Sequence, residues 1–317
     1  MKKIGITFTP MTEDRLNKIR TAAPDYKLII TDDSDEMLKE CEIVFGPMNA
    51  KLVAASTKLK WLHVQWAGVE HVLNTEYGFP EHVILTNSSG SYGVTISEYL
   101  LTISLMLMRK MNEYVLQQQK CLWRRLGSEK SIYGSTICVL GLGNIGENYA
   151  QRCKALGASL VKAVVRTKRL SKPNFVDELF TVEKLKEAVF DADIVAVCMP
   201  GTTETTGLIN KGIFHSMKKG VILLNIGRGR IIDRNALIEA LESGHIGAAG
   251  LDVTDPEPLP ENSPLWKMSN VVITPHVSGN NTLEITNDLG VDKFVKYLEN
   301  YITGKPFERV VDKVLGY

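Results

Sequence analysis

The chain has 317 residues, of which 44% are hydrophobic and 23% are charged, a composition typical of globular proteins and unlike that of disordered, collagen-like or disulfide-stapled chains. Its 37 Lys and Arg residues nearly balance its 36 Asp and Glu residues, so no overall field favours nucleic acid or a membrane as partner. The length exceeds the roughly 250–300 residues at which one hydrophobic core stops growing, which predicts two domains with small molecules or like subunits as partners.

The five cysteines are scattered and lack the paired spacing that zinc or redox sites use. We therefore expect reduced thiols, no metal site and a cytoplasmic protein. The N-terminus predicts a strand and no signal peptide, because Thr7, Thr9 and Pro10 interrupt its apolar run. The most apolar stretch, Leu100–Met108, has about half the length that a membrane span needs, so no membrane segment is expected.

Short apolar, β-branched runs alternate with helical patterns along most of the chain. The first hundred residues predict strands at Ile4–Phe8, Leu28–Thr31, Ile43–Phe45, Trp61–Gln65 and Val83–Thr86. A second series predicts strands at Ile137–Leu140, Leu160–Val165, Ile194–Val197, Val221–Asn225, Ala248–Leu251 and Val271–Thr274. Helical patterns fall between them, at Glu13–Arg20, Asn144–Leu156, Val182–Val189, Lys211–Met217 and Asn235–Ser243. Continuous apolar strands separated by helices indicate two doubly wound α/β domains with parallel sheets.

Two longer helical patterns organise the domains. Val94–Gln119 predicts one long helix that is apolar on almost every side, which suggests a homodimer built on it. The last helical pattern, Leu283–Tyr301, follows the second strand series, and we expect it to fold back onto the first domain. The predicted domains are therefore residues 1–97 and 283–317 for one, which binds the substrate, and 98–282 for the other, which binds a dinucleotide.

A glycine-rich loop stands at the start of the second strand series. Gly141, Gly143 and Gly146 have the G-x-G-x-x-G spacing, directly after an apolar strand and at the start of a helix. The first glycine permits a tight turn, the second lets the backbone approach a pyrophosphate, and the third lets helix and strand pack closely. The helix N-terminus then offers free N–H groups to the phosphates. This context predicts dinucleotide binding.

The next strand ends in a basic segment where NAD-binding units carry a carboxylate for the ribose hydroxyls. The basic residues between 162 and 172 are Lys162, Arg166, Lys168, Arg169 and Lys172, with no acidic residue among them. One interpretation is a solvated basic loop. The other is a pocket for the 2′-phosphate of NADP, which guanidinium groups bind well and a carboxylate would repel.

Polar residues follow three later strands: Arg228, Asp252 and His276, with Glu257 in a proline-flanked loop between the last two. Singly, these residues have ordinary explanations, namely a turn arginine, a loop glutamate and a helix-capping histidine. Doubly wound sheets place ligands at the carboxyl ends of their strands, so we expect the group to converge on one crevice.

With these motifs the chain resembles the D-isomer-specific 2-hydroxyacid dehydrogenase family, in particular its glyoxylate/hydroxypyruvate reductase branch. The matching stretches are Ala67–His71, the GLGNIG loop, Pro200–Gly207 and the segments around Arg228, Glu257 and His276. The resemblance implies a Rossmann cofactor domain inserted in a discontinuous flavodoxin-like substrate domain. It also implies a homodimer that reduces a small 2-oxo acid, such as glyoxylate or hydroxypyruvate, to the D-2-hydroxy acid.

The resemblance further implies residue roles. Arg228, Glu257 and His276 form the catalytic trio, in which Arg228 holds the substrate carboxylate and carbonyl, His276 donates the proton and Glu257 sets the imidazole tautomer. The backbone amides of Gly68 and Val69, beside Ala67, bind the substrate carboxylate, and Asp252 contacts the nicotinamide carboxamide. The implied cofactor contacts are Gly141, Gly143, Asn144, Ile145, Gly146, Arg166, Thr167, Lys168, Arg169, Met199, Pro200, Thr205, Ile226, Gly227, Asp252, His276 and Gly279.

One departure from the family pattern concerns the cofactor. Many members carry Asp at the end of the second strand of the cofactor domain, where this chain has Val164, Val165 and Arg166. We therefore expect NADP to be preferred, with NAD as the alternative, and the spacing leaves open which of Arg166, Lys168 and Arg169 meets the 2′-phosphate. Two other functions of the same fold remain: a nucleotide-sensing, corepressor-like interaction protein, and oxidation of another anion such as phosphite.

Overall fold

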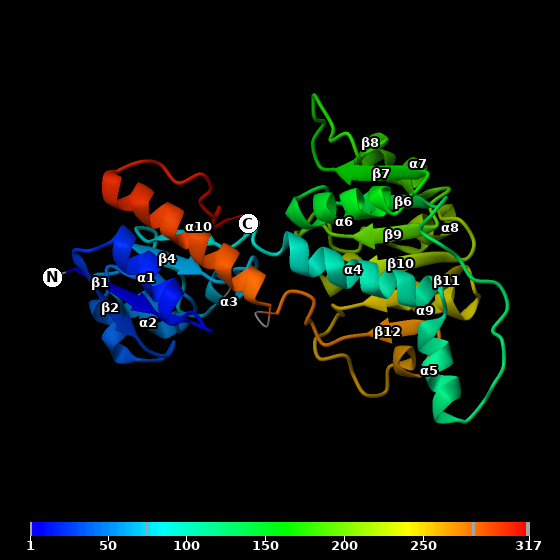
Figure 1. Cartoon of the computed structure of the whole chain (residues 1–317), viewed down its shortest axis with the longest axis horizontal. Coiled ribbons are helices and arrows are strands. Elements are labelled where there is room, and N and C mark those ends of the chain that lie inside the picture. The colour runs from blue at the N-terminus through cyan, green and yellow to red at the C-terminus, as the bar shows by residue number, and fades with distance from the viewer. Residues whose placement is uncertain (1, 74, 281–282, 315–317) are drawn as a thin grey trace. The chain divides into compact units, whose positions relative to one another are not determined.

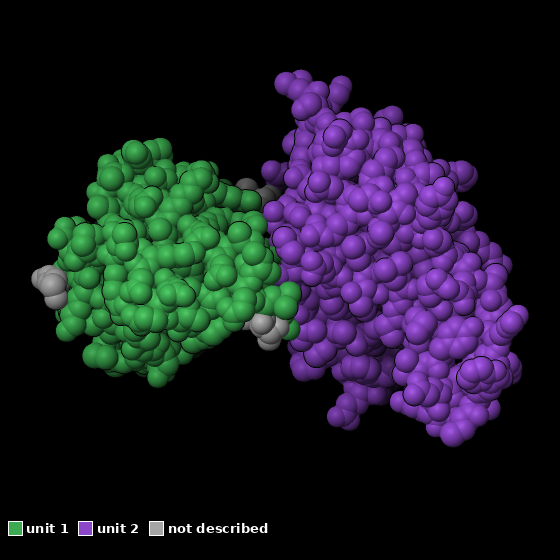
Figure 2. Space-filling model, viewed as in Figure 1, with its two compact units in different colours: residues 1–92, 280–317 green, residues 93–279 purple. Residues whose placement is uncertain are grey.

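The computed structural model describes residues 2–73, 75–280 and 283–314 and divides the chain into two compact units. Unit 1 consists of residues 1–92 and 280–317, and unit 2 is Gly93–Gly279 (Figure 2). The predicted domain boundaries follow residues 97 and 282, each a few residues after the change of unit, and residue 282 itself lies outside the described residues. Each unit is a parallel sheet with interleaved helices, which confirms the predicted fold class.

Unit 1 contains a five-stranded sheet with the strand order β2-β1-β3-β4-β5, an order typical of flavodoxin-like folds. All of its strand pairs are parallel. The strands are short, and all except the edge strand β2 are largely buried; each lies within about two residues of its predicted bounds. They are β1 (Lys2–Ile6), β2 (Tyr26–Ile30), β3 (Ile43–Phe45), β4 (Trp61–Val64) and β5 (Ile84–Asn87).

Helices cover both faces of this sheet. One face packs against α1 (Glu13–Ala22) and α10 (Glu284–Thr303), whose Val291 and Phe294 are fully buried beside the strands. The prediction that the last helix returns to the first domain is therefore confirmed. The other face packs against three short helices that sequence analysis did not predict: η1 (Glu36–Glu40), α2 (Ala50–Ala55) and α3 (Glu70–Leu73).

Unit 2 contains a seven-stranded sheet with the order β12-β11-β10-β9-β6-β7-β8. Its central part has the strand order of a Rossmann domain, in which the order reverses between the first and fourth strands. Here that switch point lies between β6 and β9, which pair directly. The strands are β6 (Thr136–Leu140), β7 (Leu160–Val165), β8 (Glu178–Thr181), β9 (Ile194–Val197), β10 (Val221–Asn225), β11 (Ile246–Leu251) and β12 (Val271–Ile273).

The helices of unit 2 also form two layers. In Figure 1, α4 (Gly93–Met108) and α6 (Asn144–Ala155) lie side by side against one face of the sheet. The other face packs against α7 (Leu185–Val189), α8 (Lys211–Ser216) and α9 (Arg234–Glu242). Strand β8 was not predicted, because this edge strand is only partly buried and its four residues include just two apolar ones.

The predicted helix Val94–Gln119 is wrong as one element. The structure has α4 and a separate α5 (Met111–Gln119), because Lys110 takes a left-handed backbone conformation with φ 53°. The Lys110 ammonium donates to the carbonyl of Leu126 at 2.7 Å, which ties the break to the segment that follows α5. Neither glycine nor proline marks this position, so the sequence pattern carries no sign of the break.

Three of the cysteines, Cys41, Cys138 and Cys153, are buried, Cys198 is partly buried and Cys121 is exposed after α5. Within residues 2–73, 75–280 and 283–314, no helix is long and apolar enough to cross a membrane.

Candidate active site

The glycine loop connects β6 to α6. Gly141 has φ +99°, and a Cβ there would lie 2.8 Å from the Met199 backbone nitrogen, while a Cβ on Gly146 would lie 2.1 Å from the Gly141 carbonyl oxygen. Both positions therefore require glycine. Gly143, at the N-cap of α6, has nothing within 4 Å of the place its Cβ would take. The loop thus leaves open space beside the first amides of α6, including those of Asn144 and Ile145, as phosphate binding requires.

The basic segment after β7 is partly as predicted. Lys162 was wrongly counted with this segment: its side chain is buried in β7, and its ammonium lies 2.6 Å from the Asp191 carboxylate. The residues beyond the strand end, Arg166 to Arg169, are exposed. Arg169 donates to the carbonyl of Leu142 at 2.6 Å, which brings its guanidinium to the glycine loop itself. No carboxylate follows Val165, in agreement with the sequence departure noted above.

The loops after β9 and β10 carry most of the other predicted cofactor contacts. Met199 and Ile226 are buried at the ends of these strands, and Gly227 donates its N–H to Asn225 Oδ1 at 3.0 Å. The hydroxyl of Thr205 donates to the Pro200 carbonyl at 2.8 Å and shapes that loop. Both loops leave the carboxyl ends of strands on one side of the switch point, β9 directly beside it and β10 next to β9, and doubly wound folds bind ligands at this end of the sheet.

Three neighbouring strands end at the polar residues singled out in the sequence. β10, β11 and β12 pair in that order, and Arg228, Asp252 and His276 follow their carboxyl ends. Arg228 is half-buried and donates from Nη1 to the carbonyl of Gly227 at 2.8 Å. The three residues therefore follow adjacent strands at one end of the unit 2 sheet, and their convergence on one crevice stays a prediction.

His276 and Glu257 form a direct pair. The imidazole Nδ1 lies 2.9 Å from Glu257 Oε2, and both side chains are about half exposed. Glu257 Oε1 accepts from the backbone N–H of Thr254 at 3.1 Å, so the carboxylate is held in place. A ring that donates from Nδ1 to this carboxylate leaves Nε2 available for proton exchange.

Asp252 has a structural role that the sequence analysis missed. Its buried carboxylate accepts hydrogen bonds from the Thr274 hydroxyl at 2.6 Å, the Val277 N–H at 2.8 Å and the Ser278 N–H at 3.0 Å. These partners lie on both sides of His276 and hold the loop from Thr274 to Gly279. No local sequence pattern points to this anchor, because its partners begin 22 positions later in the chain.

The backbone of His276 is strained. Its φ of 54° places a non-glycine residue in the left-handed region, which costs about 1–2 kcal/mol and persists only where the surroundings hold it. The His276 N–H donates to the Asp252 carbonyl at 2.8 Å. Backbone strain of this kind is frequent at functional sites, so the conformation of His276 supports it as a candidate functional residue.

The predicted carboxylate loop lies in unit 1, after β4. Asn87 donates to the carbonyl of Ala67 at 2.6 Å, and the hydroxyl of Tyr92 donates to the carbonyl of Gln65 at 2.6 Å. Val69 is fully buried, whereas Ala67 is exposed and Gly68 partly so. The fold thus anchors both ends of a short loop and leaves its middle at the surface.

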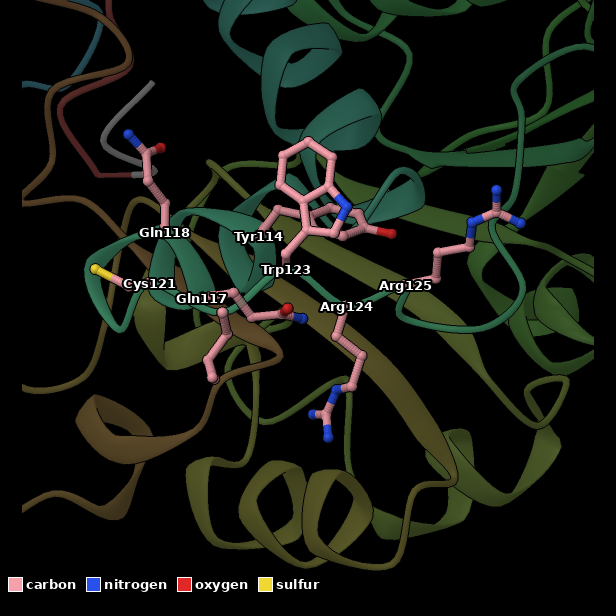
Figure 3. Close-up of a pocket in the computed structure, with 8 residues that line it drawn as sticks. Tyr114, Gln117, Gln118, Cys121, Trp123, Arg124 and Arg125 are labelled. Carbon is pink, nitrogen blue, oxygen red and sulfur yellow. The ribbon is translucent and has the colours of Figure 1, made fainter.

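Another hollow lies away from these residues. A cavity of about 840 Å³ lies between α5 and the segment after it, and none of the predicted site residues lines it. Figure 3 shows Tyr114, Gln117 and Trp123 around this cavity, with Arg124 and Arg125 at one side. Among the described residues, no group of three or more His, Cys, Asp or Glu side chains is placed to hold a metal ion.

Comparison with known proteins identifies the family. A family model described as D-isomer specific 2-hydroxyacid dehydrogenase, NAD binding domain, matches residues 101–278. A solved NADPH-dependent glyoxylate/hydroxypyruvate reductase from Sinorhizobium meliloti, in complex with NADP and sulfate, is 26% identical with a TM-score of 0.82, and each chain is covered completely.

Among curated proteins, a glyoxylate reductase from Korarchaeum cryptofilum is 30% identical over 269 residues, which are 81% of this chain and 77% of that protein. A D-3-phosphoglycerate dehydrogenase from Archaeoglobus fulgidus is 28% identical over 315 residues, or 98% of this chain. The chain spans about half the length of that dehydrogenase and its mycobacterial counterparts. With the family model matching more than half of its residues, the chain belongs to the D-isomer-specific 2-hydroxyacid dehydrogenase family.

Proposed function

We propose that the protein reduces a small 2-oxo acid, such as glyoxylate or hydroxypyruvate, to the D-2-hydroxy acid with NADPH. The observation that carries the proposal is the pairing of His276 with Glu257 beyond the same sheet edge that presents Arg228. A proton donor, its orienting carboxylate and a guanidinium are the groups that carbonyl reduction beside a carboxylate requires.

Each of the three side chains has a separate task. Arg228 binds the carboxylate and carbonyl oxygen of the 2-oxo acid, and its positive charge stabilises the negative charge that grows on that oxygen. Glu257 accepts a hydrogen bond from His276 Nδ1 and so fixes the ring, while Nε2 donates the proton to the same oxygen. In the reverse direction the neutral ring accepts that proton.

The glycine loop fits a dinucleotide. The amides at the start of α6 would bind the pyrophosphate, in the space that Gly143 leaves open. When bound, the nicotinamide supplies the hydride for the carbonyl carbon. The loops after β9 and β10, with Asp252 and Gly279, would line the nicotinamide end, and the surface loop at Ala67–Val69 would bind the substrate carboxylate.

The basic segment supports a preference for NADP. Arg166 and Lys168 are exposed directly after β7, and Arg169 lies against the glycine loop. Their charges complement a 2′-phosphate, whereas an NAD ribose would find no carboxylate at this strand end.

A substrate panel tests the function. Purified protein is mixed with glyoxylate, hydroxypyruvate or 3-phosphohydroxypyruvate and with NADPH or NADH, and the loss of reduced-cofactor absorbance is followed. We expect turnover with small 2-oxo acids. No turnover with any of them, together with cofactor binding, would favour a corepressor-like protein, and cofactor reduction by phosphite would favour anion oxidation.

We also propose that the protein is a homodimer that uses the α5 surface. This surface exposes Met111, Val115, Leu116, Leu122 and the fully exposed Trp123 beside the cavity of Figure 3. The side-chain amide of Gln117 is buried there without a partner among the described residues. Exposed apolar side chains gathered in this way are typical of an interface.

Light scattering tests the dimer. We expect the mass of two chains for the parent and a shift toward one chain for Leu116→Lys with Trp123→Ala. Leu170→Lys, which changes an equally exposed apolar residue on the loop after β7, should leave the mass unchanged. A parent of single-chain mass at micromolar concentration would contradict this proposal.

A further inference from the structure

The loop that carries His276 is held through a chain of side chains that reaches α4. The Thr274 hydroxyl lies 2.6 Å from Asp252 Oδ1 and 2.5 Å from the Tyr99 hydroxyl. A carboxylate only accepts hydrogen bonds, and a threonine hydroxyl has one proton. Thr274 must therefore donate that proton to Asp252, and Tyr99 must donate to Thr274. The direction of both hydrogen bonds follows from this.

Tyr99 is suited to a permanent donor role. Its side chain is half-buried, and burial raises the pKa of the phenol to about 12. The hydroxyl therefore keeps its proton throughout the neutral range. None of the roles assigned so far uses this side chain.

The position of Tyr99 in the chain is also informative. The chain passes from unit 1 to unit 2 between Tyr92 and Gly93, where α4 begins, and returns to unit 1 after Gly279. Tyr99 lies on α4, the first helix after the chain enters unit 2, and Thr274 lies on the last loop before the chain leaves it. The hydrogen bond at Thr274 connects these two segments directly.

We propose that Tyr99 is a positioning residue for the reaction, acting through Thr274 and Asp252 to hold His276 in its left-handed conformation. The strained His276 backbone depends on Asp252, which binds the amides of Val277 and Ser278. Tyr99 fixes the rotation of the Thr274 hydroxyl and with it one acceptor oxygen of Asp252. This inference rests on the proposed function, because it assigns the consequence to proton transfer by His276.

The first experiment compares Tyr99→Phe with a matched control. Tyr99→Phe should lower kcat for 2-oxo acid reduction by about threefold to tenfold, the range that one neutral hydrogen bond provides, with the NADPH dissociation constant unchanged. The control is Tyr149→Phe, which removes a buried hydroxyl 2.7 Å from Ser104 between α6 and α4. We expect kcat of this control to equal that of the parent. A Tyr99→Phe enzyme with parental kcat would overturn the proposal.

A double-mutant cycle tests whether Tyr99 acts through Thr274. Thr274→Val should lower kcat at least as much as Tyr99→Phe, and Thr274→Ser, which keeps a hydroxyl, should restore most of it. In the Thr274→Val background, Tyr99→Phe should cause no further loss. Two losses that multiply would show that Tyr99 does not act through this hydroxyl, and the proposal would be wrong.

Amide hydrogen exchange separates this inference from the proposed function. The amides of Val277 and Ser278 should exchange faster in Tyr99→Phe than in the parent or in Tyr149→Phe. This readout does not depend on turnover. A parent without reductase activity would refute the proposed function while exchange still tests the hydrogen-bond chain, and unchanged exchange would refute the chain whatever the activity.

Discussion

The two units share one architecture, yet each has a histidine whose surroundings are the opposite of the other's. In unit 1, His63 is fully buried within β4, and its ring nitrogens lie 2.7 Å from the Thr86 hydroxyl and 3.1 Å from the Ser88 hydroxyl. In unit 2, His276 lies beyond the end of β12, exposed and paired with the Glu257 carboxylate. One ring is sealed between hydroxyls and aromatic side chains, and the other meets solvent.

This difference shows that position along a strand decides what a histidine does. Burial lowers the pKa of His63 to about 3, so the ring stays neutral and serves as a packed hydrogen-bonding group. A ring beyond the carboxyl end of a strand keeps its access to water and ligand. The accessibility of His276 agrees with the chemical role that we propose for it, and the burial of His63 indicates a structural role; the two roles can be tested separately.

The largest expected effect is on turnover. His276→Gln should lower kcat by roughly 10²–10⁴-fold, the usual contribution of a positioned general acid. Cofactor binding should survive, because the glycine loop is untouched. The matched control is His215→Gln, which changes an exposed histidine on α8 that contacts the Lys211 carbonyl. Turnover of His276→Gln within threefold of the parent would mean that another group donates the proton.

The second effect is on acid stability and concerns His63. Its pKa in the folded protein, about 3, lies below the ordinary value of 6.5, so between these values the unfolded chain binds the proton and the native protein does not. The free energy of unfolding therefore falls as the pH falls from 6.5, by about 1.4 kcal/mol per pH unit. At pH 4.5 the loss is about 2.7 kcal/mol.

Urea unfolding of the parent and of His63→Gln, each at pH 7 and pH 4.5, measures this contribution. We expect the variant to lose less stability on acidification, whatever its stability at pH 7. An equal loss in parent and His63→Gln would contradict the role given to burial.

The smallest effect concerns the choice between NADPH and NADH, which we expect the basic segment after β7 to determine. Replacing Arg166, Lys168 and Arg169 together by Gln should reduce the preference for NADPH over NADH by about 10–100-fold in kcat/KM, the effect of losing one charged hydrogen bond to the 2′-phosphate at roughly 1.5–3 kcal/mol. Lys184→Gln, a surface cation paired with Glu187, is the control. The proposal fails if the parent uses NADH as efficiently as NADPH at low salt.

Much of the fold was predictable because the strands are continuous apolar runs. The predicted bounds of β3, β7, β9 and β10 agree with the structure. The glycine loop was predictable because its glycine spacing, between an apolar strand and a helix, is itself a sequence motif. Packing over short sequence distances is what such patterns record.

The features that were missed depend on contacts that are remote in sequence. The break at Lys110 is held by a carbonyl beyond α5, and the burial of Lys162 depends on Asp191 across the sheet. The anchoring role of Asp252 needs its partners on the His276 loop, and Tyr99 reaches Thr274 over 175 positions. No periodicity in the sequence records such pairs.

The cysteines differ in their exposure to solvent, so that one of them can be labelled selectively. Burial raises the pKa of Cys138 and Cys153 to about 12 and that of Cys41 to about 11, and it also raises the pKa of Cys198, so these four thiols resist alkylation at neutral pH. Cys121 is exposed and lines the cavity beside α5. A thiol-directed fluorophore should therefore attach at this single site without displacing the glycine loop or the His276 loop, and its emission would report on the α5 surface at which we propose that two chains meet.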